Sequence, residues 1–103
     1  MSIATSMLLL KLLSEEDKYG YQMIRELEER SEQIFVMNEG TIYPILHSLE
    51  AEGKISGYSG TAENGRKRKY YRITEEGREE LQKKRSEWTS YRKAVGRILG
   101  ETE

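Results

Sequence analysis

The sequence predicts a single, mainly α-helical domain with one small β-hairpin. Three observations support this fold class. Apolar residues recur at helical spacing in three segments before residue 54, an Asn-Gly pair separates two short segments rich in aromatic and β-branched residues, and a heptad pattern continues from residue 81 towards the C-terminus. The chain has 103 residues, of which 36% are hydrophobic, and this is enough for one domain with one core.

The first predicted helix, residues 3–13, is apolar on nearly every side. Such a helix must be covered by its own domain, by a partner chain, or by both. Residues 19–30 form the second predicted helix, which has Met23, Ile24 and Leu27 on one face and acidic residues on the other.

The third predicted helix lies in residues 38–55, NEGTIYPILHSLEAEGKI, and Gly53 is placed to close it. Its buried stripe follows the i, i+3, i+4, i+7 spacing and comprises Ile42, Ile45, Leu46 and Leu49. The residues that project from the other side are Glu39, Gly40, Tyr43 and His47. This face is small and polar at its N-terminal end, where a recognition helix contacts base edges. The second and third helices therefore indicate a helix–turn–helix.

The single proline of the chain, Pro44, lies inside this third helix. If Thr41 is the N-cap, Pro44 occupies the first turn, where its missing N–H has no acceptor. If Asn38 is the N-cap, the proline lies one turn further in and should bend the helix. The sequence is compatible with both positions.

Residues 55–61 and 66–73 are predicted to form the β-hairpin, because Asn64-Gly65 between them is a strong turn signal. The stretch GRKRKYYR contains no anion and five cations, which are Arg66, Lys67, Arg68, Lys69 and Arg72. The net charge of the whole chain is only −1, so the positive charge is local. Five uncompensated cations beside a helix–turn–helix favour phosphate binding over a merely solvated pair of strands.

The last helix is predicted to begin after Thr74, which can act as its N-cap. From Leu81 onwards its apolar residues follow a heptad seam that is interrupted only at Lys84. The members of this dimerisation seam are Trp88, Tyr91, Val95 and Ile98. The seam and the apolar first helix both lack obvious cover within so small a domain, so we expect a two-fold homodimer.

No catalytic or metal site can be assembled from these residues. The chain has no cysteine and one histidine, His47, so a metal ion would need a cage of carboxylates. Adjacent carboxylates such as Glu15-Glu16 point about 100° apart on a helix and suit solvation better than acid–base chemistry. Tyr19 and Tyr21 are interpreted as packing residues. We therefore expect no enzymatic activity and no cofactor.

The apolar run MLLLKLL near the N-terminus is too short to span a bilayer, and it lacks a basic leader. We expect a soluble, cytoplasmic protein without membrane association.

Three motifs resemble those of the PadR-family transcriptional regulators, in the same order and with similar spacing: YGYQMIRELEE, EGTIYPILHSLEAEGKI and GRKRKYYRITEEGREEL. The resemblance covers residues 7–81, and a chance match of three ordered motifs is improbable. It implies a winged helix-turn-helix DNA-binding domain in residues 1–73 and a C-terminal dimerisation helix in residues 74–103, as in the shorter branch of the family. Members are DNA-binding dimers, generally repressors, whose third helix enters the major groove while the hairpin wing contacts the backbone or minor groove.

Carried over by position, the resemblance places the following residues at the DNA: Asn38, Thr41, Tyr43 and His47 on the third helix, and Arg66, Lys67, Arg68 and Lys69 on the wing. The exposed face of the helix adds Glu39 and Gly40, and Pro44 lies in the same segment. The implied partner is an operator in double-stranded DNA, which we expect to be palindromic.

Trp88 has two interpretations. It is either a packing residue of the seam or a ligand-binding residue, because in multidrug-sensing members of the short branch a tryptophan of the C-terminal helix from each subunit flanks a flat ligand. Trp88 resembles that tryptophan by its distance from TEEG, and the resemblance places Met7 and Leu10 of the first helices beside it. The many cations nearby favour a neutral or anionic aromatic effector, or none, over a cationic one.

The resulting prediction is a dimeric, ligand-responsive repressor that binds a palindromic operator. The alternative is a winged-helix module that binds protein or RNA without operator specificity. The sequence determines neither the operator, nor the regulated gene, nor the effector.

Overall fold

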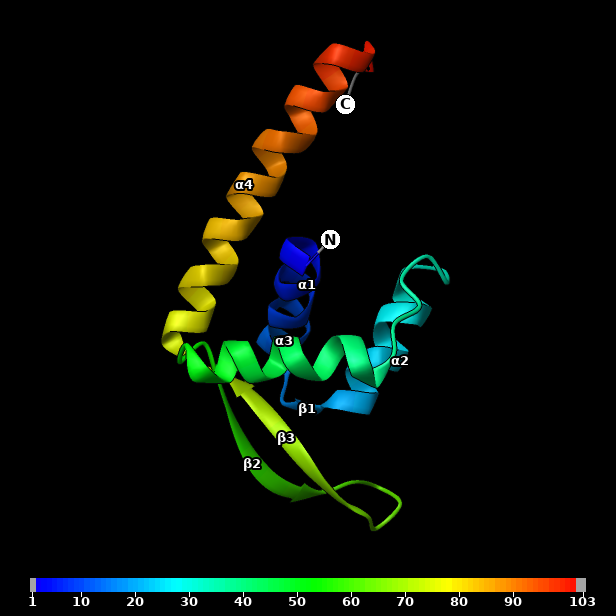
Figure 1. Ribbon diagram of the computed structural model, residues 1–103, viewed down its shortest axis with the longest axis vertical. Helices are drawn as coiled ribbons and strands as arrows, with labels where there is room; N and C mark the ends of the chain where they lie inside the picture. Colours follow the sequence, from blue (N-terminus) through cyan, green and yellow to red (C-terminus); the bar gives the residue numbers. More distant parts are fainter. Residues whose placement is uncertain (1, 102–103) are drawn as a thin grey trace.

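The computed structural model describes residues 2–101, which form four helices and a small three-stranded sheet (Figure 1). In chain order the elements are α1 (Ser2–Glu15), β1 (Lys18–Tyr19), α2 (Gly20–Arg30), α3 (Glu39–Ala51), β2 (Ile55–Thr61), β3 (Lys67–Ile73) and α4 (Glu75–Leu99). The predicted fold class, mainly helical with a small hairpin, is confirmed. Strand β1 is an addition to it, because two residues are too short to show a periodic pattern.

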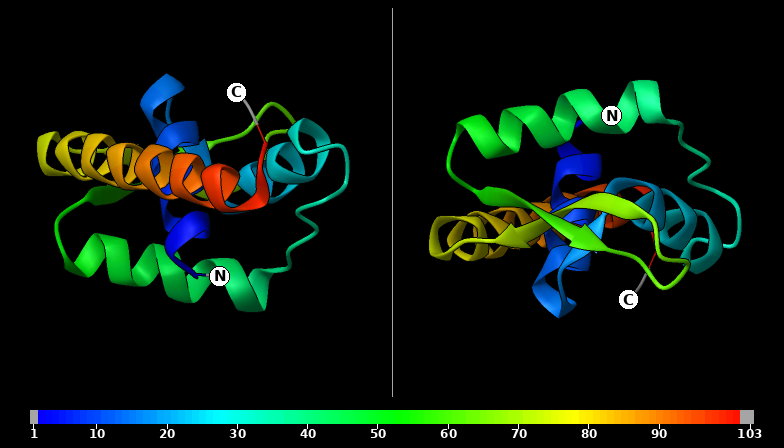
Figure 2. Two further views of the ribbon diagram at one scale, coloured as in Figure 1. Left: turned by 90° about the horizontal axis from the view of Figure 1, so that it is seen from above. Right: turned by 90° about the horizontal axis from the view of Figure 1, so that it is seen from below.

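Helix α1 forms the centre of the hydrophobic core. Leu9 and Leu10 are 0% exposed and Leu13 is 1% exposed, because α1 packs against α2, α3, β3 and α4 (Figure 2). The expectation that this helix lacks cover within its own chain is therefore wrong. Two of its hydrophobic residues, Met7 and Leu8, are only partly buried.

The sheet is antiparallel throughout, and β3 is its central strand. Tyr70 of β3 lies opposite Tyr19 of β1 and Tyr58 of β2, with ring centroids 5.4 and 5.8 Å away. These contacts attach the wing, which comprises β2, β3 and residues 62–66 between them, to the start of α2. The turn itself needs Gly65, whose φ of +82° is unfavourable for other residues.

The structure decides between the two possible N-caps of α3. Asn38 is the N-cap, and its side chain accepts a hydrogen bond from the backbone N–H of Thr41 at 3.0 Å. Pro44 therefore lies inside the helix, beyond the first turn, and the carbonyl of Gly40 receives no hydrogen bond from residue 44. At the other end of α3, Gly53 has a φ of +76°, which agrees with its predicted role in closing the helix.

The start of α4 forms a joint with the end of α3. The Thr74 hydroxyl accepts a hydrogen bond from the Gly77 N–H at 3.1 Å and donates one to the Gly53 carbonyl at 2.6 Å. A Cβ atom at Gly77 would overlap the backbone carbonyl of Lys54, so only glycine fits there. The Lys54 ammonium also pairs with Glu80 at 3.0 Å. These contacts confirm the predicted cap and connect the two helices.

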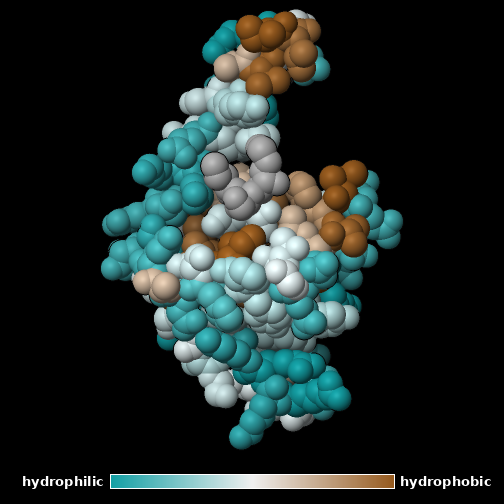
Figure 3. Space-filling model, in the orientation of Figure 1, coloured by the Kyte–Doolittle hydropathy of each residue, from teal (hydrophilic) through white to brown (hydrophobic). Residues whose placement is uncertain are grey.

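The wing and α4 extend from opposite ends of the molecule (Figure 1). Figure 3 shows that the wing end is hydrophilic, whereas hydrophobic side chains gather at the far end of α4. A further apolar group, Ile34, Phe35 and Val36, is exposed in the connection between α2 and α3. Within residues 2–101 no helix is both long and apolar enough to cross a membrane.

Candidate nucleic-acid interface

The N-terminal end of α3 offers few free polar groups. The side-chain oxygen of Asn38, Oδ1, accepts hydrogen bonds from both the backbone N–H and the hydroxyl of Thr41, at 3.0 and 3.3 Å. The side-chain oxygens of both residues are therefore occupied in capping the helix. Gly40 and Pro44 are exposed but have no polar side-chain atom.

Glu39, Tyr43 and His47 lie one turn apart along one side of α3. Glu39 and His47 are exposed, as predicted. Tyr43 departs from the prediction, because it is half-buried and its ring covers Gly20 at the start of α2. Burial raises the pKa of the Tyr43 hydroxyl, and the nearby Glu39 carboxylate raises it further.

Two of the five wing cations have acidic partners, which corrects the prediction that all five are uncompensated. The Lys69 ammonium lies 3.1 Å from a carboxylate oxygen of Glu50 on α3. The Arg72 guanidinium lies 3.4 Å from Asp17, which precedes β1. Each acid is distant in sequence from the cation that it pairs with, so a count of charges along the chain could not reveal the pairing.

The other three cations differ in exposure. Arg68 is half-buried, its guanidinium lies 5.5 Å from the centre of the Tyr19 ring, and its buried Nε atom has no hydrogen-bond partner. Arg66 and Lys67 are exposed at the wing tip and form no salt bridge with any residue that the structure describes. These two are the cations best placed to meet a phosphate.

Glu50 fixes the distance between α3 and the wing. Its carboxylate accepts a hydrogen bond from Lys69 at 3.1 Å and a second from the backbone N–H of Gly57 at 3.1 Å. The hydrogen bond with Lys69 lowers the pKa of the Glu50 carboxyl and raises the pKa of the Lys69 ammonium. The wing is thus held against α3 by a charged contact as well as by the sheet.

A cavity of about 380 Å³ opens between the start of α2, the start of α3 and the wing. The residues that line it are Tyr19, Tyr21, Glu39, Tyr43, Arg66, Arg68 and Lys69. Tyr21 is 49% exposed here, although the sequence suggested a packing residue. The position of Tyr21 in the sequence could not show this exposure, because the cavity forms only where α2, α3 and the wing meet.

Helix α4 carries an uncovered apolar stripe. The predicted seam residues are exposed to the following extents: Trp88 47%, Tyr91 60%, Val95 38% and Ile98 86%. Leu99, which was not included in the seam, is 63% exposed beside them. Leu81, by contrast, is buried against the core of its own chain. The stripe is therefore exposed along α4 from Trp88 onwards.

A second cavity, of about 310 Å³, lies between α1 and α4 beside Trp88. Its lining residues are Met7, Leu8, Lys11, Leu81, Arg85, Trp88, Thr89 and Arg92. Met7 lines this cavity together with Trp88, whereas Leu10 is completely buried in the core and does not line it. Leu8 lines it instead. The described lining contains three cations and no carboxylate.

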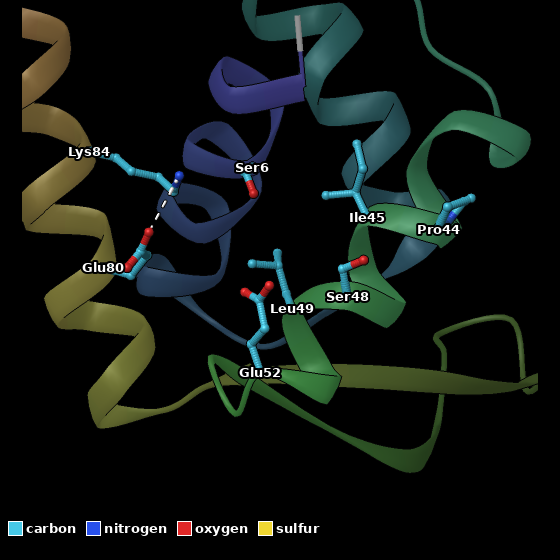
Figure 4. Close-up of a pocket in the computed structure, with 8 residues that line it drawn as sticks. All are labelled: Ser6, Pro44, Ile45, Ser48, Leu49, Glu52, Glu80 and Lys84. Carbon is cyan, nitrogen blue, oxygen red and sulfur yellow. Dashed lines mark ion pairs between the residues drawn. The ribbon is translucent and has the colours of Figure 1, made fainter.

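A third cavity, of about 430 Å³, lies between α1, α3 and α4 (Figure 4). Helix α3 contributes Ile45 and Leu49, and α4 contributes Glu80 and Lys84, which form an ion pair at 3.4 Å. Its lining includes two carboxylates, Glu52 and Glu80, and no aromatic ring, whereas the lining beside Trp88 has one indole ring and no carboxylate. The cavity beside Trp88 is therefore the better candidate for an effector.

Within the described residues, no three histidine or carboxylate side chains are grouped closely enough to hold a metal ion.

Comparison with known proteins agrees with this geometry. The family model "Transcriptional regulator PadR-like family" matches residues 9–83. An uncharacterized protein from Lysinibacillus sphaericus is 35% identical over 88 residues, which is 85% of this chain and 81% of that protein.

Several solved structures have the same fold. A transcriptional regulator from Clostridium thermocellum has a TM-score of 0.83 and 33% identity, with 91% of each chain covered. A PadR family transcription regulator from hypervirulent Clostridium difficile has a TM-score of 0.81 and 32% identity, covering 91% of this chain and 96% of that one. A PadR-like transcriptional regulator from Bacillus cereus has a TM-score of 0.82 and 31% identity, covering 95% and 93%.

Proposed function

Because the chain belongs to the PadR-like family of transcriptional regulators, we propose that it is a repressor that binds a palindromic operator as a homodimer. The observation that carries this proposal is that the start of α3 and the wing border one cavity, to which Glu39 of α3 and the unpaired Arg66 of the wing both contribute. In a winged helix-turn-helix, α3 would enter the major groove, and the wing would contact the DNA backbone.

The uncovered stripe on α4 supports the homodimer. Its aromatic and aliphatic side chains follow the heptad spacing of a helix that packs against a second helix. A second copy, related by a two-fold axis, presents the same stripe and can cover it. The two α3 helices must then lie about 34 Å apart to engage successive major grooves on one side of the DNA.

Operator binding is tested by fluorescence anisotropy with a labelled duplex from the promoter region of the protein's own gene. We expect two chains per site, a steep dependence on salt, and affinity at least about 1,000-fold above that for an unrelated duplex. Equal affinity for both duplexes would rule out an operator-specific regulator. Preference for RNA hairpins or single strands, or uniformly weak binding, would support the alternative of an RNA- or protein-binding module.

Repression is tested with a reporter gene behind the same promoter. Deletion of the regulator should raise reporter output, and re-expression should lower it again. A fall in output on deletion would identify an activator instead.

We also propose that an aromatic effector binds beside Trp88. The cavity there is lined by apolar side chains, a half-exposed indole ring and three cations, of which Lys11 also pairs with Glu15. This lining suits an aromatic anion. Helix α4 carries Trp88 and is joined through Thr74 and Gly77 to the end of α3, so a shift of α4 would move the recognition helix. A coupling of about 1 to 3 kcal/mol would weaken operator binding 5- to 150-fold.

The effector proposal is tested with benzoate, benzyl alcohol and benzylammonium, which share one ring and differ in charge. Trp88 is the only tryptophan, so quenching of its fluorescence reports binding directly. Benzoate should quench most strongly and should release the labelled operator. If benzoate releases Trp88→Ala from DNA with unchanged potency, the effector site lies elsewhere.

A further inference from the structure

Glu39 is an acidic residue on a surface proposed to bind a polyanion. It is the first residue of α3, it is exposed, and it lines the cavity shared with the wing. A carboxylate that is brought close to phosphates is repelled by them, and this repulsion disfavours binding. Its presence there is favourable only if the DNA offers it a hydrogen-bond donor, and in the major groove the donors are base amino groups.

The side chains next to Glu39 in α3 are poorly placed to accept a hydrogen bond from a base amino group. The side-chain oxygens of Asn38 and Thr41 are engaged with each other and with the backbone of α3. Gly40 and Pro44 have no polar side-chain atom, and Tyr43 is half-buried. The Glu39 carboxylate is therefore the one ionised side-chain acceptor in the first turns of α3.

The protein does not neutralise this carboxylate. Three cations line the same cavity, but none of them forms a salt bridge with Glu39 among the described contacts. Lys69 is paired with Glu50 instead, and Arg68 lies against the Tyr19 ring. The Glu39 carboxylate is therefore not engaged in a described salt bridge and is available to accept a hydrogen bond from DNA.

From this geometry we infer that Glu39 reads a cytosine in each half-site of the operator, an inference that rests on the proposed function. Cytosine presents its N4 amino donor in the major groove without an adjacent acceptor. Adenine also presents an amino group, but its N7 acceptor lies beside it and repels a second carboxylate oxygen. Guanine and thymine present acceptors to the groove. Two-fold symmetry repeats the contact, so the cytosine recurs at the equivalent position of both half-sites.

The test is a selection of binding sites from a randomised pool of duplex DNA by the full-length protein. Wild-type protein should select a palindrome with one C·G pair per half-site that Glu39→Gln no longer selects. Because glutamine bonds adenine at N6 and N7, the variant should select A·T at that position. Labelled duplexes that differ only there should show a preference of about 10-fold for C·G with wild-type protein, reversed in the variant.

Glu52→Gln provides the matched control, because it removes the same charge from the exposed far end of α3. It should leave the selected sequence unchanged. If Glu39→Gln strengthens binding to every duplex equally and keeps the wild-type preference, Glu39 only repels DNA and the inference is wrong.

An acid at the start of a helix also stabilises the helix dipole, so the melting temperature of Glu39→Gln is measured in parallel. A purely structural role would lower the melting temperature and leave the base preference unchanged, which would also overturn the inference. Failure of wild-type protein to select any sequence would instead refute the proposed function, and the two failures are therefore distinguishable.

Discussion

At the scale of single residues, the wing shows that charge counted along the chain differs from charge available at a surface. Lys69 is held by Glu50 and Arg72 by Asp17, whereas Arg66 and Lys67 have no acidic partner among the described residues. Unpaired, exposed cations meet a phosphate without first breaking an internal salt bridge.

Replacement of both Arg66 and Lys67 by alanine should therefore weaken binding to all duplexes to a similar degree. The slope of log affinity against log salt should flatten by about one unit for each lost phosphate contact, as measured by anisotropy over a salt series. Lys83→Ala removes a charge from an exposed position on α4 and should not change the slope. An altered base preference with an unchanged slope would contradict the assignment of these residues to the DNA backbone.

A second charged pair joins the end of α1 to the end of α2. The Arg30 guanidinium donates two hydrogen bonds to Glu15, at 2.8 and 2.9 Å. This contact is the main cause that lowers the pKa of Glu15 from 4.5 to about 2. Because the pKa is lower in the folded state, the pair stabilises the fold above about pH 4.5, and the contribution is lost as the pH falls towards 2.

Glu15→Gln should lower the free energy of unfolding at pH 7 by up to about 1 kcal/mol, the upper end for a solvent-accessible ion pair. Urea denaturation at pH 7 and at pH 3 should show that the variant loses less free energy of unfolding on acidification than the wild type does. Some loss should remain, since the pKa values of Glu50 and Glu80 are lowered too. Glu29→Gln, at an exposed position in α2, is the control, and an equal pH dependence in both variants would exclude the Glu15 contribution.

At the scale of elements, α3 combines a good N-cap with an unfavourable interior residue. Asn38 supplies the cap, but Pro44 provides no N–H for the Gly40 carbonyl, and its ring is crowded against that carbonyl. Pro44 is exposed and lies at the edge of the cavity between α3 and α4. Its cost to the helix is therefore not offset by burial in the core.

Pro44→Ala should stabilise the protein by about 1 to 2 kcal/mol. The helix gains up to about 3 kcal/mol, and the greater freedom of the unfolded chain offsets up to about 1 kcal/mol of this gain. Urea denaturation measures the difference. Ser48→Ala, one turn later on an exposed position of the same helix, should change stability much less. A destabilised Pro44→Ala protein would show that contacts of the proline ring outweigh the missing hydrogen bond.

At the scale of the whole molecule, the surface proposed for DNA and the surface proposed for dimerisation lie at opposite ends (Figures 1 and 3). The core around α1 is closed within one chain, while the stripe on α4 is open. Loss of the dimer should therefore leave the core folded and should separate the two α3 helices that a palindrome requires.

Val95→Glu should convert the proposed dimer to a monomer at micromolar concentration, because it places a charge within the apolar stripe. Analytical ultracentrifugation measures the assembly, and circular dichroism should show that the helices remain. Ser90→Glu adds the same charge to an exposed position away from the stripe and should stay dimeric. A Val95→Glu protein that sediments as a dimer would place the interface elsewhere.

The sequence by itself determined the features that depend on neighbouring residues. Asn64-Gly65 marks the turn of the wing, Gly53 closes α3, and Thr74 caps α4, because turns and caps are formed by residues a few positions apart. The periodicity of apolar residues likewise located the four helices.

Only the tertiary structure decided the features that depend on residues distant in sequence. The choice between two local caps of α3 was also left open by the sequence, and the packed chain has Asn38. Leucines surround most of α1, so its pattern could not show that Leu8, and not Leu10, faces Trp88. The pairing of Lys69 with Glu50 arises only when the wing folds back onto α3. Local signals fix where an element begins and ends, but the partner of a side chain is fixed by which elements pack together, and that depends on the whole chain.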